Sequence, residues 1–202
     1  MKMSYNGGMD KTRRFLIIAI RCCFVILALL FFVLILVDPN YHKWGGVLAG
    51  LGLPFLPPII ERVFKSKISF RIQLLYYIFL FIALDLGICM DMYKSVPYFD
   101  KVVHFGSGVI STIVGYYAIV HYGATKTSPV FRSLVIIGIS MMIAVAWEFF
   151  EFGCDKFLGQ NMQQLVSVGV DDTMFDLLSA TLGSIIGALL FTNKKFVKSL
   201  EK

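Results

Sequence analysis

Charged residues are scarce in this chain: lysine, arginine, aspartate and glutamate together make up 16% of its 202 residues. Hydrophobic residues make up 57%, and the mean hydropathy is +0.76. One soluble core cannot enclose so much apolar surface, which excludes a soluble globular protein. The sequence also lacks a low-complexity tract, a separate soluble segment and a strong internal repeat. We therefore expect a single integral membrane domain, residues 1–202.

Several functional signatures are absent as well. The chain has no nucleotide-binding loop, no HExxH zinc motif and no recognised nucleophile motif. The first apolar block is longer than the core of a signal peptide and is not followed by a small-residue cleavage site, so it is expected to remain as a span. The net charge of +6 is explained by contact with anionic lipid head groups, and no nucleic-acid partner is expected.

Apolar blocks long enough to cross a bilayer recur along the chain, since a helix needs about 20 apolar residues to cross about 30 Å of hydrocarbon. The six blocks cover residues 15–37, 44–60, 70–90, 102–122, 132–152 and 174–191. The second is the weakest, because it is short and contains Pro54, Pro57 and Pro58; a re-entrant hairpin is the alternative there. The predicted fold is an all-α, polytopic transmembrane bundle of six spans.

The distribution of lysine and arginine predicts the orientation, because these residues collect in short cytoplasmic loops. With six spans, one side carries the basic amino terminus, the 61–71 loop, Lys126, Arg132 and the basic carboxyl-terminal segment. The other side carries only Lys43, Lys94, Lys101 and Lys156. Losing one span would place the amino terminus and the 61–71 loop on opposite sides. Both termini are therefore expected to be cytoplasmic.

Two features bear on helix packing. Arg21 lies only about 9 Å inside the first span and is expected to snorkel to the cytoplasmic head groups. Glycine pairs at four-residue spacing, Gly46/Gly50 and Gly183/Gly187, permit close approach of helices.

Acidic side chains and one histidine gather at the outer ends of the last four spans. Three sets have the spacing of one helix face: Asp100/His104, Glu148/Glu151/Asp155 and Asp172/Asp176. Acidic groups buried together repel unless a cation or protons neutralise them, and a mixed Asp/Glu/His set suits a divalent metal cation. The predicted metal ligands are His104, Glu148, Glu151 and Asp176, and the predicted catalytic residues are Asp100 and Asp172.

Simpler roles exist for some of these residues. Asp100, Asp155, Asp171 and Asp172 lie at helix ends, where carboxylates are solvated or cap a helix. Asp85 lies deeper and is interpreted as a secondary partner of the site or as a protonated structural group.

The cysteines at the outer helix ends raise the question of a bridge. A disulfide between Cys89 and Cys154 would tie two helix ends together, but it requires Cα atoms within about 7 Å, and free thiols are expected.

Three ordered segments carry a family resemblance. Tyr98-Phe-Asp-Lys-Val-Val-His-Phe-Gly-Ser-Gly108, Trp147-Glu-Phe-Phe-Glu151 and Asp171-Asp-Thr-Met-Phe-Asp176 resemble the YjdF-type family of bacterial inner-membrane proteins. The Asp-Lys-x-x-His-Phe element is more distantly similar to VanZ-like proteins. The resemblance implies a bacterial cytoplasmic (inner) membrane location. It also implies site positions at Asp100, His104, Glu148, Glu151, Asp172, Thr173 and Asp176.

Two functional classes follow from the acidic site. The first is an intramembrane enzyme in which a divalent cation polarises the phosphate or ester of a lipid or lipid-linked substrate, while Asp100 or Asp172 acts as general base. The second is a transport or binding protein that couples cations or protons to a substrate. Six spans without a repeat make a small translocator, so the transport class would call for a homodimer. Membrane lipids are the expected partners in both classes.

Overall fold

The computed structural model describes residues 10–38, 43–163 and 169–200. Within them the elements are helices, and no strand occurs. The helices are α1 (Lys11–Val37), α2 (Trp44–Gly52), α3 (Leu56–Val63), α4 (Phe70–Leu80), α5 (Met92–Ser95), α6 (Phe99–His121), α7 (Pro129–Leu158), α8 (Val170–Thr192) and α9 (Lys194–Leu200). Short 3₁₀ turns cover Leu53–Phe55 and Ala124–Lys126, and a π-helical segment, Phe81–Cys89, continues α4.

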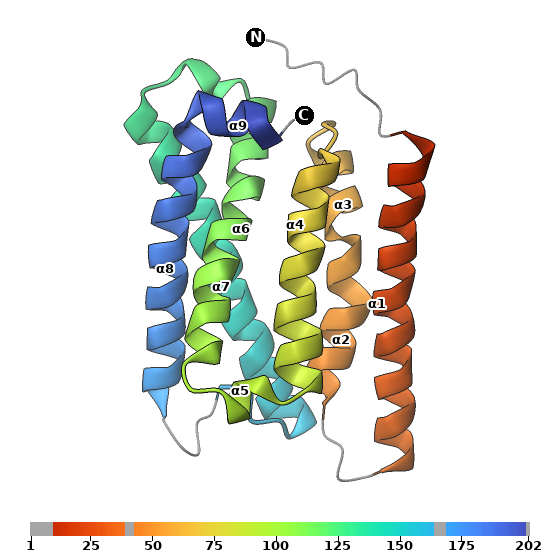
Figure 1. The fold of residues 1–202 in the computed structure, drawn as a ribbon. Coiled ribbons are helices and arrows are strands. Elements are labelled where there is room, and N and C mark those ends of the chain that lie inside the picture. Colours follow the sequence, from red (N-terminus) through yellow and green to blue (C-terminus); the bar gives the residue numbers. More distant parts are fainter. Residues whose placement is uncertain (1–9, 39–42, 164–168, 201–202) are drawn as a thin grey trace.

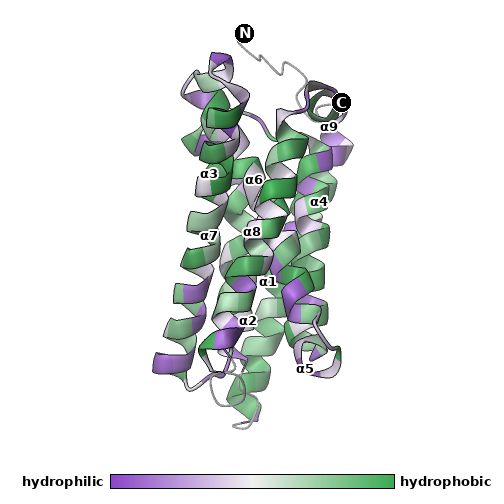
Figure 2. Ribbon diagram, turned by 90° about the vertical axis from the view of Figure 1, so that its left-hand side faces the viewer, coloured by the Kyte–Doolittle hydropathy of each residue, from purple (hydrophilic) through white to green (hydrophobic). Residues whose placement is uncertain are grey.

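Six described segments are long and apolar enough to cross a membrane, which confirms the six-span fold. They run Lys11–Val37, Trp44–Val63, Phe70–Cys89, Phe99–His121, Pro129–Leu158 and Val170–Thr192. Figure 1 shows them side by side, with α1 beginning and α9 lying at one end of the bundle, and α5 at the other. In Figure 2, which is coloured by hydropathy, hydrophobic residues (green) occupy most of the length of the bundle. The last three spans extend beyond the apolar blocks, because their helices continue through the acidic residues.

The second span is a broken helix that crosses the bundle, and not a re-entrant hairpin: α2 and α3 lie end to end around the 3₁₀ turn (Figure 1). Pro57 and Pro58 have no N–H to donate to the carbonyls four residues earlier. The Tyr76 hydroxyl donates to the carbonyl of Leu53 at 2.7 Å, and the Tyr77 hydroxyl donates to that of Pro54 at 2.9 Å. Two tyrosines of α4 thus compensate for the prolines.

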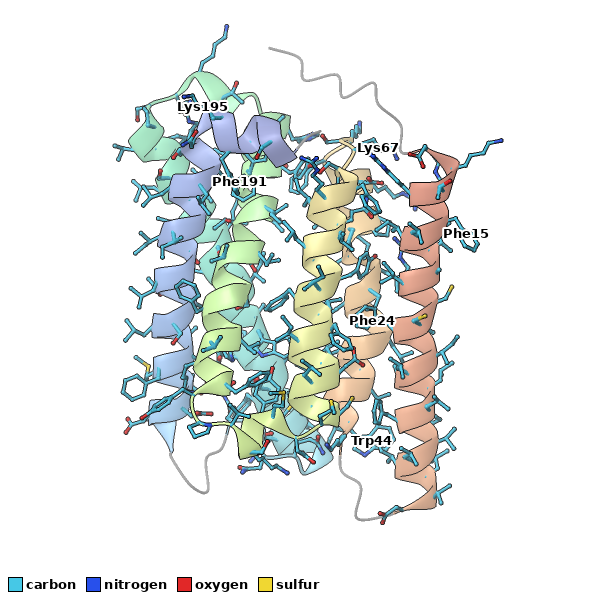
Figure 3. All side chains as sticks on the ribbon, in the orientation of Figure 1. Phe15, Phe24, Trp44, Lys67, Phe191 and Lys195 are labelled. Atoms are coloured by element: carbon cyan, nitrogen blue, oxygen red, sulfur yellow. The ribbon has the colours of Figure 1, made fainter. Side chains whose placement is uncertain are left out.

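Arg21 has two partners within the bundle that the sequence did not predict. Its Nε donates to the Tyr77 hydroxyl at 3.2 Å, and its guanidinium lies 5.7 Å from the centre of the Phe55 ring. The side chain therefore turns toward Tyr77 and Phe55, because a hydroxyl and an aromatic face offer it partners there. In Figure 3, Phe24 on the same helix also points toward α4, whereas Phe15 points away from the bundle.

The helices α6, α7 and α8 form the unit that carries the acidic residues. A Cβ on Gly108 would clash with the carbonyl oxygen of Ala180, and one on Gly183 would clash with that of Phe105. At the same level Ser140 of α7 donates to the Gly108 carbonyl at 2.9 Å. Close backbone contact between α6 and α8 thus fixes how the two helices are rotated toward each other.

Candidate functional site

Three helix ends bring the predicted site residues together at the end of the bundle where α5 lies (Figure 1). Helix α6 begins there, α7 ends there and α8 begins there. Among the predicted residues, five side chains are buried, and Asp100 is largely so: His104, Glu148, Glu151, Asp172 and Asp176 are exposed by 7% or less. Such burial argues against the simple solvation of these groups.

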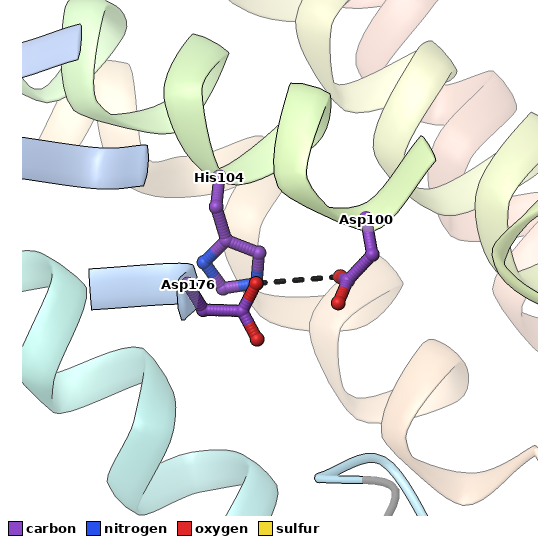
Figure 4. A group of neighbouring side chains, drawn as sticks. All are labelled: Asp100, His104 and Asp176. Atoms are coloured by element: carbon purple, nitrogen blue, oxygen red, sulfur yellow. Dashed lines mark ion pairs between the residues drawn. The ribbon is translucent and has the colours of Figure 1, made fainter. Parts of the chain in front are cut away.

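The closest group consists of Asp100, His104 and Asp176. His104 Nε2 lies 3.5 Å from Asp100 Oδ1 and 3.7 Å from Asp176 Oδ1. One ligand atom from each residue lies within 4.8 Å of the others, which is close enough for a common metal ion, and Figure 4 shows the three side chains converging. Two carboxylates and an imidazole are ordinary ligands of first-row divalent metals.

Lys101 is the site residue that the sequence interpretation missed. Its Nζ lies 2.6 Å from Asp172 Oδ1, 2.8 Å from Asp176 Oδ1 and 3.0 Å from Asp100 Oδ2. By the distribution of charge alone, Lys101 is one of the few basic residues on the predicted outer side. Its position three residues before His104, on the same helix face, was the signal that could have identified it.

Glu148 lies on the opposite side of the His104 imidazole from Asp100 and Asp176. Its Oε1 is 3.9 Å from His104 Nδ1, whereas Asp100 and Asp176 face Nε2. Both carboxylate oxygens of Glu148 are buried without a hydrogen bond among the residues that the structure describes. The geometry resembles a carboxylate behind a metal-binding histidine, where it orients the ring.

Glu151 is held by its own helix: the indole Nε1 of Trp147 donates to Glu151 Oε1 at 2.7 Å. The spacing of four residues places both side chains on one face of α7. The structure thus brings Glu151 into the buried layer, but outside the closest ligand group.

Asp155 has a structural role. Its carboxylate accepts hydrogen bonds from the backbone N–H of Met162 at 2.6 Å and of Gln163 at 2.9 Å, which folds the segment after α7 back over the helix end. Gln163 is buried, and its Nε2 donates to Thr173 Oγ1 on α8 at 3.2 Å. Asp171 is exposed, in keeping with a solvated carboxylate.

Tyr93 of α5 lies outside the spans at the same end of the bundle as the site, and no spacing in the sequence pointed to it. Its ring packs on Gly87, where a Cβ would clash with it, and lies 5.3 Å from the Phe99 ring. Burial raises the pKa of the Tyr93 hydroxyl above its usual range, and the carboxylates of Asp100, Glu151 and Asp176 raise it further. Tyr93 therefore remains a neutral hydroxyl near the acidic layer.

The remaining residues singled out in the sequence lie apart from the closest group. Asp85 belongs to the π-helical segment, and its Oδ2 is buried without a hydrogen bond among the described residues. Cys89 and Cys154 are free thiols, as expected.

Comparison with known proteins identifies a family whose description names no activity. The sequence profile described as "Predicted membrane protein (DUF2238)" matches residues 20–195. A protein of Thermotoga maritima, described as uncharacterized, is 26% identical over 141 residues, which cover 70% of this chain and 72% of the relative. No solved structure matches.

Proposed function

The chain belongs to the family of predicted membrane proteins described as DUF2238, and we propose that it is a divalent-metal-dependent enzyme acting on a lipid or lipid-linked substrate at the membrane interface. The observation that carries this proposal is the group of Asp100, His104 and Asp176, in which His104 and Asp176 are buried and Asp100 is partly buried, with ligand atoms within 4.8 Å of one another. It lies at the end of the bundle where α5 lies, the level at which lipid head groups are expected.

The charge of the site supports a bound cation. Two carboxylates about 4 Å apart repel by about 4 kcal/mol at an effective dielectric constant of about 20. The buried layer holds five carboxylates, and Lys101 is the cationic side chain that the described residues place against three of them. A divalent ion would supply the further positive charge. The ligands Asp100, His104 and Asp176 would hold it, and Glu148 would orient the imidazole.

The chemistry we propose is hydrolysis of a phosphate or carboxylic ester. The ion would polarise the ester oxygen and lower the pKa of a bound water. Asp172 is the better candidate for general base, since Asp100 belongs to the closest ligand group. The water oxygen would bond to the phosphorus or carbonyl carbon while Asp172 accepts the water proton. The bond between that atom and the alcohol oxygen would then break, and Asp172 would return the proton to the leaving alcohol.

The location is part of the proposal. We propose that the site faces the outer leaflet of a bacterial inner membrane, and the asymmetry of lysine and arginine between the two ends of the bundle supports this orientation. The likeness of the three motifs to YjdF-type proteins remains a prediction that supports the same location.

Metal analysis of the purified protein tests the proposal. Wild-type protein in detergent, stripped with chelator and dialysed against Mn²⁺ or Zn²⁺, is expected to retain about one ion, whereas Asp176→Asn retains none. The loaded protein is then incubated with bacterial lipid extract, and products are identified by mass spectrometry. Absence of bound metal in the wild type would refute the metal site, and bound metal without any product would refute the enzyme.

The second candidate is cation- or proton-coupled transport, and Lys101 favours it. An ammonium that already occupies a carboxylate cluster can exchange with an incoming cation, as an exchanger requires. Proteoliposomes with an internal pH dye distinguish the two: metal-driven proton flux that Asp176→Asn abolishes supports transport. Transport by a six-span protein would call for a homodimer, so the oligomeric state of the same detergent preparation should be measured by light scattering.

A further inference from the structure

Lys101 and the proposed metal ion require the same carboxylate oxygen. Asp176 Oδ1 lies 2.8 Å from Lys101 Nζ and 3.7 Å from His104 Nε2. An ion bound between His104 and Asp176 would draw on the oxygen that now accepts from the ammonium, and its double charge would repel the ammonium. Both cations therefore compete for one position.

Lys101 is also the most exposed member of the group, so its ammonium can move away from the carboxylates. Its side chain is 25% exposed, whereas those of Asp172 and Asp176 are exposed by 4% and 1%. The lysine side chain has four methylene carbons joined by rotatable bonds, so the ammonium can turn toward the interface while the backbone of Lys101 stays in α6. The aspartates cannot follow it, because α8 is fixed against α6 by Gly183.

A second observation points to a ligand in this layer. Glu148 is 4% exposed, both of its oxygens lack a hydrogen bond among the described residues, and Oε1 faces His104 Nδ1 at 3.9 Å. A buried carboxylate in this position costs free energy unless the imidazole carries a proton or a metal on its other face.

We propose that Lys101 is a tethered counter-cation that divalent metal displaces, and that the released ammonium then binds the phosphate of an anionic lipid head group. This inference rests on the proposed metal site. It makes binding ordered: before metal binds, Lys101 is held by its aspartates and the site repels anions. After metal binds, both the ion and the ammonium favour a phosphate.

Metal titration of matched variants tests the competition. Mn²⁺ binding to detergent-purified wild type, Lys101→Met and Lys101→Arg is measured by calorimetry without lipid. Lys101→Met is expected to bind Mn²⁺ about tenfold more tightly than wild type, since a competing positive charge is gone, and Lys101→Arg is expected to stay near wild type. Equal or weaker binding by Lys101→Met overturns the competition while leaving the metal site intact. No binding by wild type overturns the proposed function and this inference together.

Chemical labelling provides a readout on the wild type, should Lys101→Met fail to fold. Acetic anhydride should acetylate Lys101 faster in the presence of Mn²⁺, as read by mass spectrometry, while Lys94 serves as the exposed reference. An unchanged or slower rate at Lys101 overturns the displacement.

The anion step is tested with dihexanoyl phosphatidic acid, dihexanoyl phosphatidylcholine and inorganic phosphate. Phosphatidic acid is expected to bind the Mn²⁺-loaded wild type, to bind loaded Lys101→Met more weakly because only the ion remains to attract the phosphate, and not to bind the metal-free protein. Inorganic phosphate binding as tightly as phosphatidic acid would assign the site to free phosphate and overturn the lipid part, as would equal binding of the phosphatidylcholine.

Discussion

Gly183 of α8 lies against the backbone carbonyl of Phe105, the residue that follows His104 on α6. The contact is about two helical turns from Asp176. It therefore sets the distance between the imidazole and the carboxylate of the closest ligand group.

Replacing this glycine should destabilise the protein. Gly183→Ala places a methyl group against a backbone oxygen that cannot move aside, and we expect the free energy of unfolding to fall by about 1–3 kcal/mol. Thermal melting in detergent measures it. Gly138→Ala on α7 is the matched control, since a Cβ there meets nothing within 4 Å. Equal melting temperatures for the two variants would contradict the close contact of α6 and α8.

Loss of a single central charge should separate metal binding from folding. Asp176→Asn is nearly isosteric, so the protein should still fold, but we expect Mn²⁺ or Zn²⁺ to lose its stabilising effect on the melting temperature. Asp171→Asn, an exposed carboxylate at the same helix end, should respond to metal as the wild type does. If chelator and metal leave all three proteins melting identically, the site holds no divalent ion.

Glu148 should act through His104. Because its carboxylate faces Nδ1 and the closest ligands face Nε2, we expect Glu148→Gln to weaken Mn²⁺ binding by about tenfold, and His104→Ala to abolish it. Calorimetry with the two variants compares them directly. A loss in Glu148→Gln as complete as that in His104→Ala would make Glu148 a ligand in its own right, as the sequence analysis expected.

The orientation in the membrane can be tested by cysteine labelling. In a variant whose native cysteines are replaced, an impermeant maleimide applied to intact cells should label Lys94→Cys or Lys156→Cys and leave Lys126→Cys unlabelled. All three positions are exposed. Lys43 is a poor probe, since its ammonium pairs with Asp91 at 3.0 Å. Labelling at position 126 alone would invert the orientation and move the site to the cytoplasmic face.

The second span shows where sequence reasoning reached its limit within the fold. Hydropathy identified the block and the prolines that weaken it. The partners of the freed carbonyls, Tyr76 and Tyr77, lie on another span, and only the packed bundle brings their hydroxyls to Leu53 and Pro54.

The sequence by itself determined the six spans and the helix faces on which the acidic residues lie. Both are local properties: hydropathy depends on consecutive residues, and the faces of Asp100/His104, Glu148/Glu151 and Asp172/Asp176 follow from the helical repeat.

Only the tertiary structure decided which of these helix faces meet and which of their atoms come close together. The rotation of α6 against α8, fixed by close backbone contact at Gly108 and Gly183, brings Asp100, His104 and Asp176 together and draws Lys101 in among the aspartates. That rotation depends on contacts between residues more than 70 positions apart in the chain. A helical repeat, which describes each helix alone, carries no information about it.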